Sequence, residues 1–389
     1  MRLLHTADWH LGRTIRGRSR APEFEAVLAE VCGIAIDEGV DVVIVAGDIW
    51  DSMTPPPEAD RLLYSALRRL IEAEVDVVLV AGNHDNARRL EALGQLAGLL
   101  GVRTQATVKR WDAGGTITIE RGGETLRLAA VPWVPDGRVL NAQEIIGTTA
   151  ESLQTYADRV AEIYRQSAQA FTDETINVFA AHVFVDESLV ALVDGSERRV
   201  HIGQTYAVKP AALPAYAQYV ALGHVHQPQE IEAPNHAATY SGSLLQLDFG
   251  ERNQDKVVRL VDAAPGRPAR HRPVALTSGR RLVEARGSFQ EIVAQGGREG
   301  DAFIRAVLSL DGPEPGIAPR LREALPNCVE VRVEHALKAD ETPPAALATM
   351  TPQDLFVRYF KETHSGAAPT PEILAVFREV LEAATAEVS

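Results

Sequence analysis

Two nearly identical apolar runs, VDVVIVAGD from Val40 and VDVVLVAGNHD from Val75, constrain the fold of this chain most strongly. Continuous runs of β-branched residues are typical of strands buried inside parallel sheets. The segments 22–38 and 58–74 have the apolar spacing of amphipathic helices. Because parallel strands need a crossover connection, this alternation predicts consecutive βαβ units and an α/β fold. The similarity between the two runs does not continue along the chain, which excludes a solenoid of repeats.

Further strands and one long helix are predicted from the same apolar patterns. The expected strands cover 2–7, 126–133, 176–182, 219–226 and 239–243, and the long helix covers 150–171.

The length and composition predict more than one domain. With 389 residues, 46% of them hydrophobic, the chain can bury a sizeable core in two or three domains. The Pro- and Arg-rich segment DAAPGRPARHRP after Asp262 predicts a domain boundary. We therefore expect a first domain at 1–265, a small α/β domain at 275–340 and a helical segment at 348–389. The elements of the small domain should follow the order strand, helix, strand, helix, strand.

The termini and cysteines limit the compartment and the kind of metal site. The start lacks the apolar core of a signal peptide, and no stretch approaches the roughly 18 apolar residues of a membrane span, so a soluble cytoplasmic protein is expected. Cys32 and Cys328 form no C-x-x-C pattern, which excludes thiolate zinc fingers. Any metal must therefore be bound by nitrogen and oxygen ligands.

Polar residues of the metal-binding types follow several predicted strands. Carboxylate, amide and imidazole donors at the carboxyl ends of parallel strands can meet at one edge of a sheet. Taken alone, a D-x-H pair could be a turn with a capping Asp, and a lone buried His is usually a core residue. Together, the segments predict a site for two divalent ions that hydrolyses a phosphoester. The candidate ligands are Asp8, His10, Asp48, Asn83, His182, His224 and His226.

The glycine before Asp48 makes this carboxylate the strongest single candidate, since it lets the backbone approach closely and a carboxylate can bridge two cations. His84 follows the candidate ligand Asn83 and stays free for proton chemistry, in which it would stabilise or protonate the leaving oxygen. The mixed donor set does not fix the metal, although four imidazoles fit Mg²⁺ poorly.

The pattern D-x-H, G-D-x-x-D, G-N-H-D, H and G-H-x-H resembles the calcineurin-like metallophosphoesterase superfamily. Within it, DWHLG, GDIWD, the YSGS at 240–243 and the two-part C-terminal region resemble the SbcD family, the nuclease subunits of bacterial SbcCD complexes. The resemblance implies two central β-sheets flanked by helices. It also implies that Asp8, His10, Asp48 and His226 bind one ion and that Asp48, Asn83, His182 and His224 bind the other, with manganese as the expected metal.

The resemblance further implies an activity and a partner. The expected function is a 3′–5′ exonuclease on double-stranded DNA and an endonuclease on single strands and hairpins, in DNA repair, recombination and replication. The expected partner is an SMC-like ATPase, SbcC. This chain would form a homodimer within a heterotetramer, and the complex would work at the nucleoid. Two alternatives stay open: a phosphoesterase acting on a small molecule or a phosphoprotein, and a metal-binding scaffold for the ATPase.

An acidic group should fix the tautomer of His84. The resemblance favours Asp51, with Asp85 as the second choice. The other reading of Asp51 is a turn or helix cap before the prolines that follow it.

The net charge of −14 argues against a protein that coats nucleic acid, but one segment is locally basic. RTIRGRSR, directly after the first metal motif, could hold a phosphate backbone without reading sequence. A solvated basic loop is an equal alternative. The candidate DNA-binding residues are Arg13, Arg16, Arg18 and Arg20, with possible additions from the Arg-Arg pairs at Arg88 and Arg198.

Two C-terminal helices are predicted to begin after Thr351 and Thr370, each a capping residue before a proline. Their apolar stripes could pack on the first domain. By resemblance they would instead dock on the coiled-coil base of SbcC, and the domain at 275–340 would be a capping domain that orients DNA. The stripes comprise Leu355, Phe356, Tyr359 and Phe360, and Ile373, Leu374, Phe377, Val380 and Leu381.

Overall fold

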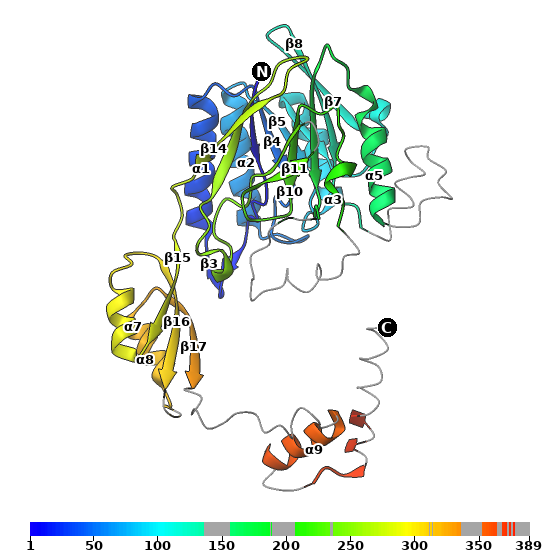
Figure 1. Cartoon of the computed structure of the whole chain (residues 1–389). Helices are drawn as coiled ribbons and strands as arrows, with labels where there is room; N and C mark the ends of the chain where they lie inside the picture. Colours follow the sequence, from blue (N-terminus) through cyan, green and yellow to red (C-terminus); the bar gives the residue numbers. More distant parts are fainter. Residues whose placement is uncertain are drawn as a thin grey trace. The chain divides into compact units, whose positions relative to one another are not determined.

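The computed structural model in Figure 1 describes residues 1–135, 156–186, 188, 207–233, 236–310, 312, 314–335, 352–363, 368–371, 373, 374, 376 and 377. The chain divides into two compact units. One comprises Met1–Leu308 and Pro315–Arg332, and the other comprises Ser309–Glu314 and Val333–Ser389.

A six-stranded sheet contains both apolar runs. Its order is β14-β13-β1-β4-β5-β6, and the four strands β1, β4, β5 and β6 are parallel, as the βαβ prediction requires. The strands are β1 (Arg2–Thr6), β4 (Val42–Ala46), β5 (Asp76–Val80), β6 (Val102–Gln105), β13 (Val257–Asp262) and β14 (Arg270–Ala275).

A second six-stranded sheet has the order β11-β12-β10-β9-β8-β7. Strands β8, β9, β10 and β12 are parallel, whereas β7 and β11 pair antiparallel at the two edges. The strands are β7 (Thr116–Arg121), β8 (Glu124–Val131), β9 (Ile176–His182), β10 (Tyr219–Gly223), β11 (Gln229–Ala233) and β12 (His236–Tyr240).

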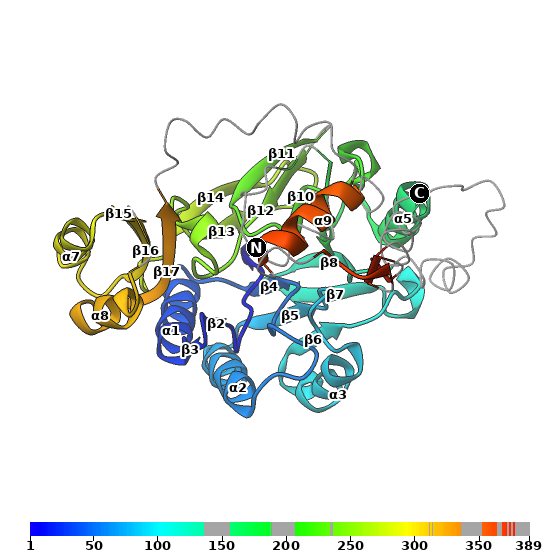
Figure 2. The same cartoon turned by 90° about the horizontal axis from the view of Figure 1, so that it is seen from below.

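The two sheets pack face to face, with helices on their outer faces (Figure 2). Alternate residues of β4, such as Ile44, join residues of the second sheet in the central core, and their neighbours, such as Val43, pack against helices. This burial of both faces explains why the strand reads as a continuous apolar run. The helices are α1 (Ala21–Asp37), α2 (Pro57–Glu72) and α3 (Ala87–Ala97) on the first sheet and α5 (Tyr156–Ser167) on the second. The predicted two-sheet sandwich is confirmed.

A three-stranded sheet with the order β15-β16-β17 follows the sandwich, and its elements alternate strand and helix as predicted. They are β15 (Leu282–Gly287), α7 (Phe289–Gly296), β16 (Phe303–Leu310), α8 (Ile317–Ala324) and β17 (Cys328–His335). We call this part the capping sheet. In the second unit, helix α9 (Pro352–Thr363) carries Phe356, whose ring stacks on Phe377 at 4.2 Å.

Short elements complete the described chain. They are β2 (Thr14–Ile15) and β3 (Arg18–Ser19), which form a hairpin, and the 3-10 turns η1 (Gly98–Leu100), η2 (Trp111–Ala113), η3 (Ala168–Ala170), η5 (Pro210–Ala212) and η6 (Phe249–Glu251).

Strand β14 lies inside the segment that was expected to separate two domains. It pairs with β13 and extends the first sheet, so this sheet passes residue 265 and ends at Ala275. Its sequence carries no apolar run because it is an edge strand whose side chains are mostly exposed.

The helix predicted at 150–171 corresponds to α5, which ends at Ser167 and is therefore shorter than predicted at its C-terminal end. Residues 150–155 lie outside the described residues, as do Arg198, Thr351, Val380 and Leu381. Within the described residues, no helix is long and apolar enough to cross a membrane.

Tyr240 of β12 fixes the segment that follows β9. Its buried hydroxyl donates to the carbonyl of Val183 at 2.8 Å and accepts from the N–H of Val185 at 2.9 Å. Tyr240→Phe leaves both backbone groups without this partner, so we expect the free energy of unfolding to fall by about 1–3 kcal/mol. Urea denaturation measures it, with the exposed Tyr216→Phe as the control. Equal stability of the two variants would contradict this packing account.

Candidate metal centre

The loops that follow β1, β4 and β10 hold four of their residues in a rare backbone conformation. The φ angles of Asp8, Asp48 and His224 are 52°, 51° and 104°, and His10 also has a positive φ, of 47°. Such angles cost about 1–3 kcal/mol each for residues other than glycine, and they persist where the surrounding structure enforces them. All four are predicted metal ligands, so the strain is concentrated at the candidate site.

Glycines allow the strand ends of the two sheets to approach closely. A Cβ atom on Gly223 would lie 1.8 Å from the carbonyl oxygen of Ala46, and one on Gly82 would lie 2.1 Å from Oδ1 of Asp48. These contacts are far inside van der Waals distance. Gly82, in the Ala-Gly pair that ends the second apolar run, and Gly223, at the end of β10, therefore make room for the polar residues of the site.

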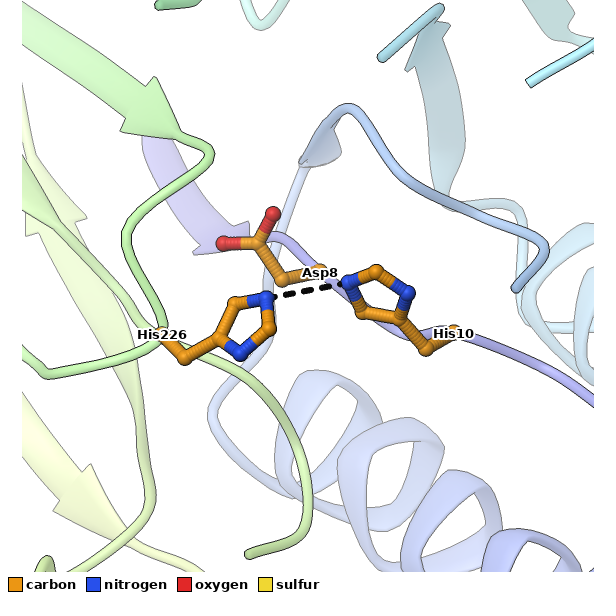
Figure 3. Close-up of side chains that lie close together, drawn as sticks. All are labelled: Asp8, His10 and His226. Carbon is orange, nitrogen blue, oxygen red and sulfur yellow. Dashed lines mark hydrogen bonds between the residues drawn. The ribbon is translucent and has the colours of Figure 1, made fainter. Parts of the chain in front are cut away.

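Asp8, His10 and His226 form the first group of converging side chains (Figure 3). The Nε2 atoms of the two imidazoles are 3.1 Å apart. Nδ1 of His226 meets a carboxylate oxygen of Glu251 at 3.0 Å, and Nδ1 of His10 lies 3.3 Å from Oδ1 of Asp51. The Glu251 carboxylate holds the ring proton of His226 at Nδ1, and the Nε2 atoms of both imidazoles face the same point.

Asp48, Asn83, His182 and His224 form the second group. Nδ1 of His182 donates to the carbonyl of Ala46 at 2.9 Å, which leaves Nε2 as the ring nitrogen that faces the candidate centre. That Nε2 lies 2.9 Å from Oδ1 of Asn83, and the same amide oxygen lies 3.0 Å from Nδ1 of His224. Acceptor atoms again converge on one point.

The Asp48 carboxylate, a member of the second group, also faces the first. Its Oδ2 is 3.6 Å from Nε2 of His10 and 3.4 Å from Nε2 of His182. Burial alone would raise the pKa of Asp48, but His182 and His10 outweigh burial and lower this pKa well below its usual range. Burial alone would lower the pKa of His182, but Asp48 and Asp8 outweigh burial and raise it to about 9, so a cation that binds Nε2 must displace a proton from it.

This arrangement fits two divalent cations. Nitrogen and oxygen atoms of the types that bind metals converge from both sides on one buried carboxylate, and such mixed donor sets hold divalent cations. All seven predicted ligands lie in these two groups.

His84 lies beside both groups, with its ring 4.9 Å from that of His10. Its ring Nδ1 meets the backbone carbonyl of Asp51 at 2.8 Å. The backbone N–H of His84 donates to Oδ1 of Asp48 at 2.9 Å. The expectation that a carboxylate fixes the tautomer of His84 is therefore corrected: Asp51 makes the contact, but through its carbonyl. The Asp51 carboxylate instead faces His10 and Arg13.

Asp85, the second choice for that role, has a different one. Its buried carboxylate accepts the N–H groups of Ile49, Trp50 and Gly82 at 2.8–3.2 Å and so ties the GDIWD and GNHD loops together. Burial and the nearby charge of Asp48 raise its pKa to about 6, against the opposing effect of these hydrogen bonds.

The basic segment forms the β2–β3 hairpin and is largely engaged by protein groups. Arg20 is buried and paired with Glu23, so its prediction as a DNA contact is corrected. Arg16 bonds Glu330 at 2.7 Å, and Arg18 bonds the carbonyl of Pro326 at 2.7 Å. Arg13 bonds Asp51 at 3.1 Å, next to the candidate centre.

The pair of Glu251 and Lys256 was missed in the sequence. Glu251 contacts His226, and Lys256 contacts Glu251 at 2.6 Å. Burial would raise the pKa of Glu251, but Lys256 and His226 lower it well below its usual range. The available signal was an acid that follows the apolar run from Leu244, but a single Glu in that position has no distinctive spacing.

Residues 1–228, more than half of the chain, match the sequence profile of the calcineurin-like phosphoesterases. The SbcD protein of the SbcCD nuclease from Bacillus subtilis is 32% identical over 98% of this chain and 97% of its own length. The chain belongs to the SbcD family of calcineurin-like phosphoesterases.

Other comparisons agree with this family. The SbcD proteins of Rhodobacter capsulatus and Escherichia coli K12 are 34% and 26% identical. The alignment with the Rhodobacter capsulatus protein covers 92% of this chain and 94% of that protein. The alignment with the Escherichia coli protein covers 76% of this chain and 73% of that protein. Residues 278–364 match the profile of the type 5 capsule protein repressor C-terminal domain.

Gly82→Ala tests the close approach at the centre. The new methyl group would overlap the carboxylate and the backbone N of Asp48, so we expect Mn²⁺ affinity to fall by about tenfold or more. Isothermal titration measures the affinity, and circular dichroism checks the fold. Gly33→Ala on α1, where a Cβ meets nothing within 4 Å, is the matched control. An unchanged affinity in Gly82→Ala would contradict the geometry.

Proposed function

We propose that this chain is a two-metal phosphodiesterase that cleaves DNA. One ion would be held by Asp8, His10, Asp48 and His226, and the other by Asp48, Asn83, His182 and His224. The observation that carries the proposal is the convergence of two acceptor groups on either side of the Asp48 carboxylate. When bound, two such ions lower the pKa of a water molecule and share the charge that develops on the phosphate.

His84 would act on the leaving oxygen of the phosphodiester. The Asp51 carbonyl occupies its Nδ1, so Nε2 is the ring atom that remains for proton transfer. The hydrogen bond from its backbone to Asp48 keeps the imidazole at a fixed place beside the centre. A positioned histidine of this kind contributes about 10²–10⁴-fold to a reaction rate as a general acid.

The relatives support DNA as the substrate, because proteins named as SbcCD nuclease components align with nearly the whole chain. By this likeness, the activity is exonuclease on double strands with 3′–5′ polarity and endonuclease on single strands and hairpins, with Mn²⁺ as the metal. The chain would work on chromosomal DNA at the nucleoid, as a homodimer within a heterotetramer with SbcC. Among the predicted arginines, Arg13 would be the one to face a phosphate backbone, because it bonds Asp51, whose carboxylate lies beside the ligand His10.

The nuclease domain would comprise residues 1–275, which include β14, and the capping domain would follow it up to residue 340. The segment 348–389 would bind the ATPase. Stacking of Phe356 on Phe377 joins two parts of this segment, while Leu355 and Tyr359 of α9 are exposed. Such a surface fits a helix or coiled coil that has its own apolar stripe.

His84→Ala should retain both ions but lose DNA cleavage by about 10²-fold or more. The same variant should cleave bis(p-nitrophenyl) phosphate much closer to the wild-type rate, because this leaving group departs without a proton. Cleavage of a labelled duplex with Mn²⁺ and metal analysis of the desalted protein give the two readouts. His271→Ala, on β14 and outside both ligand groups, is the matched control. Hydrolysis of phosphopeptides without DNA cleavage, even with SbcC present, would reject the nuclease proposal in favour of a phosphatase.

Removal of the residues after Thr349 should abolish binding to SbcC and leave Mn²⁺ content unchanged.

Two point variants of α9 show whether this binding depends on its exposed apolar residues or only on the charge of the helix. Leu355→Glu should weaken binding by about tenfold, as expected for a buried apolar contact, whereas Lys361→Glu should change it little. Biolayer interferometry measures both, and retained binding by the truncated chain would assign these helices to packing within the protein.

A further inference from the structure

The short turn η6 and the residue before it contact both a candidate metal ligand and the capping sheet. Asp248 caps η6 by accepting the N–H of Gly250 at 3.1 Å. Phe249 and Glu251, two residues apart, are both buried. They contact different parts of the protein, which makes this turn a physical connection between those parts.

Glu251 holds the side of His226 that faces away from the centre. Its Oε1 accepts from Nδ1 of His226 at 3.0 Å. A carboxylate in this position fixes the tautomer and the orientation of a ligating imidazole, and it makes the ring a stronger donor through Nε2. That Nε2 is the atom that faces His10 in Figure 3.

Glu251 is itself held from several sides. Its Oε2 accepts from Lys256 Nζ at 2.6 Å and from the N–H of Leu247 at 3.1 Å. Lys256 Nζ also donates to the carbonyl of His226 at 3.0 Å and to Oγ of Ser243 at 2.9 Å. The ammonium group therefore binds both the carboxylate and the backbone of the metal ligand, which leaves Glu251 little freedom to turn.

The opposite side of the turn packs on the capping sheet. Phe249 is fully buried in an apolar cluster with Leu282, Phe303 and Val329 of that sheet. The guanidinium group of Arg305, on β16, lies 4.4 Å from the centre of the Phe249 ring. This contact combines apolar burial with a cation–π interaction.

A chain of ion pairs runs beside this contact. Arg16 joins Asp248 at 3.3 Å to Glu330 at 2.7 Å, and Glu330 also bonds Arg305 at 3.0 Å. The hairpin arginine that was expected to meet DNA thus links η6 to β17.

We propose that Glu251 is a positioning residue for the metal ligand His226, and that packing of the capping sheet on η6 sets how tightly His226 binds its cation. The capping sheet would then tune the metal centre as well as cover it. This inference rests on the proposed metal-dependent function.

The first test is Glu251→Gln, which keeps the size of the side chain and removes its charge. We expect one of the two Mn²⁺ ions to bind about 10–100-fold more weakly in isothermal titration, with the other little changed. The absorption spectrum of the Co²⁺-loaded protein should also shift, which a loss of stability alone would not cause. Glu230→Gln, an exposed glutamate beside Arg259, is the matched control.

If Glu251→Gln does not fold because Lys256 is left buried without its partner, the double variant Glu251→Gln with Lys256→Met removes that charge. It should show the same weakened binding. A wild-type protein that binds no Mn²⁺ would reject the proposed function. Wild-type binding with unchanged affinity and spectrum in the Glu251 variant would reject this inference alone.

The second test breaks the contact with the capping sheet. Phe249→Ala, or Phe249→Leu if the first does not fold, should weaken the same ion's binding by severalfold. Combined with Glu251→Gln, it should add little, since coupled residues show non-additive effects. Unchanged Mn²⁺ affinity in the Phe249 variant would contradict the link to the capping sheet.

Discussion

The hydrogen bond between Nδ1 of His182 and the carbonyl of Ala46 is the contact on which the site depends, because it joins the strand ends of the two sheets. It turns Nε2 of His182 toward Asp48 and Asn83. Gly223 permits this approach, since any Cβ there would overlap the Ala46 carbonyl. The positive φ angles of Asp8, Asp48 and His224 then direct their side chains to the same place.

Seven candidate ligands could be named from the sequence, and the structure brings them into two groups, because each lies at or just after the end of a recognisable apolar strand. Parallel strands with buried faces leave a strong signal, and their carboxyl ends must lie at one edge. Strand β14 left no such signal, since an exposed edge strand needs no apolar residues. The end of the first sheet at Ala275 therefore could not be predicted from the sequence.

Residues whose roles depend on partners distant in the sequence were harder to predict. Arg16 bonds Glu330 and Arg20 bonds the carbonyl of Gln246, so residues more than 200 positions away decide whether an arginine is available to DNA. Glu251 has a role only because Lys256 and His226 surround it. Asp51 contacts His84 through its backbone, which a side-chain pattern cannot indicate.

The central claim is that Asp48 bridges two cations. Anomalous diffraction from crystals soaked in MnCl₂ measures this most directly. We expect two peaks roughly 3.5–4 Å apart, with the Asp48 carboxylate contacting both ions. His226 should contact one ion and His182 the other. A single peak, or two peaks of which Asp48 contacts only one, would contradict the account.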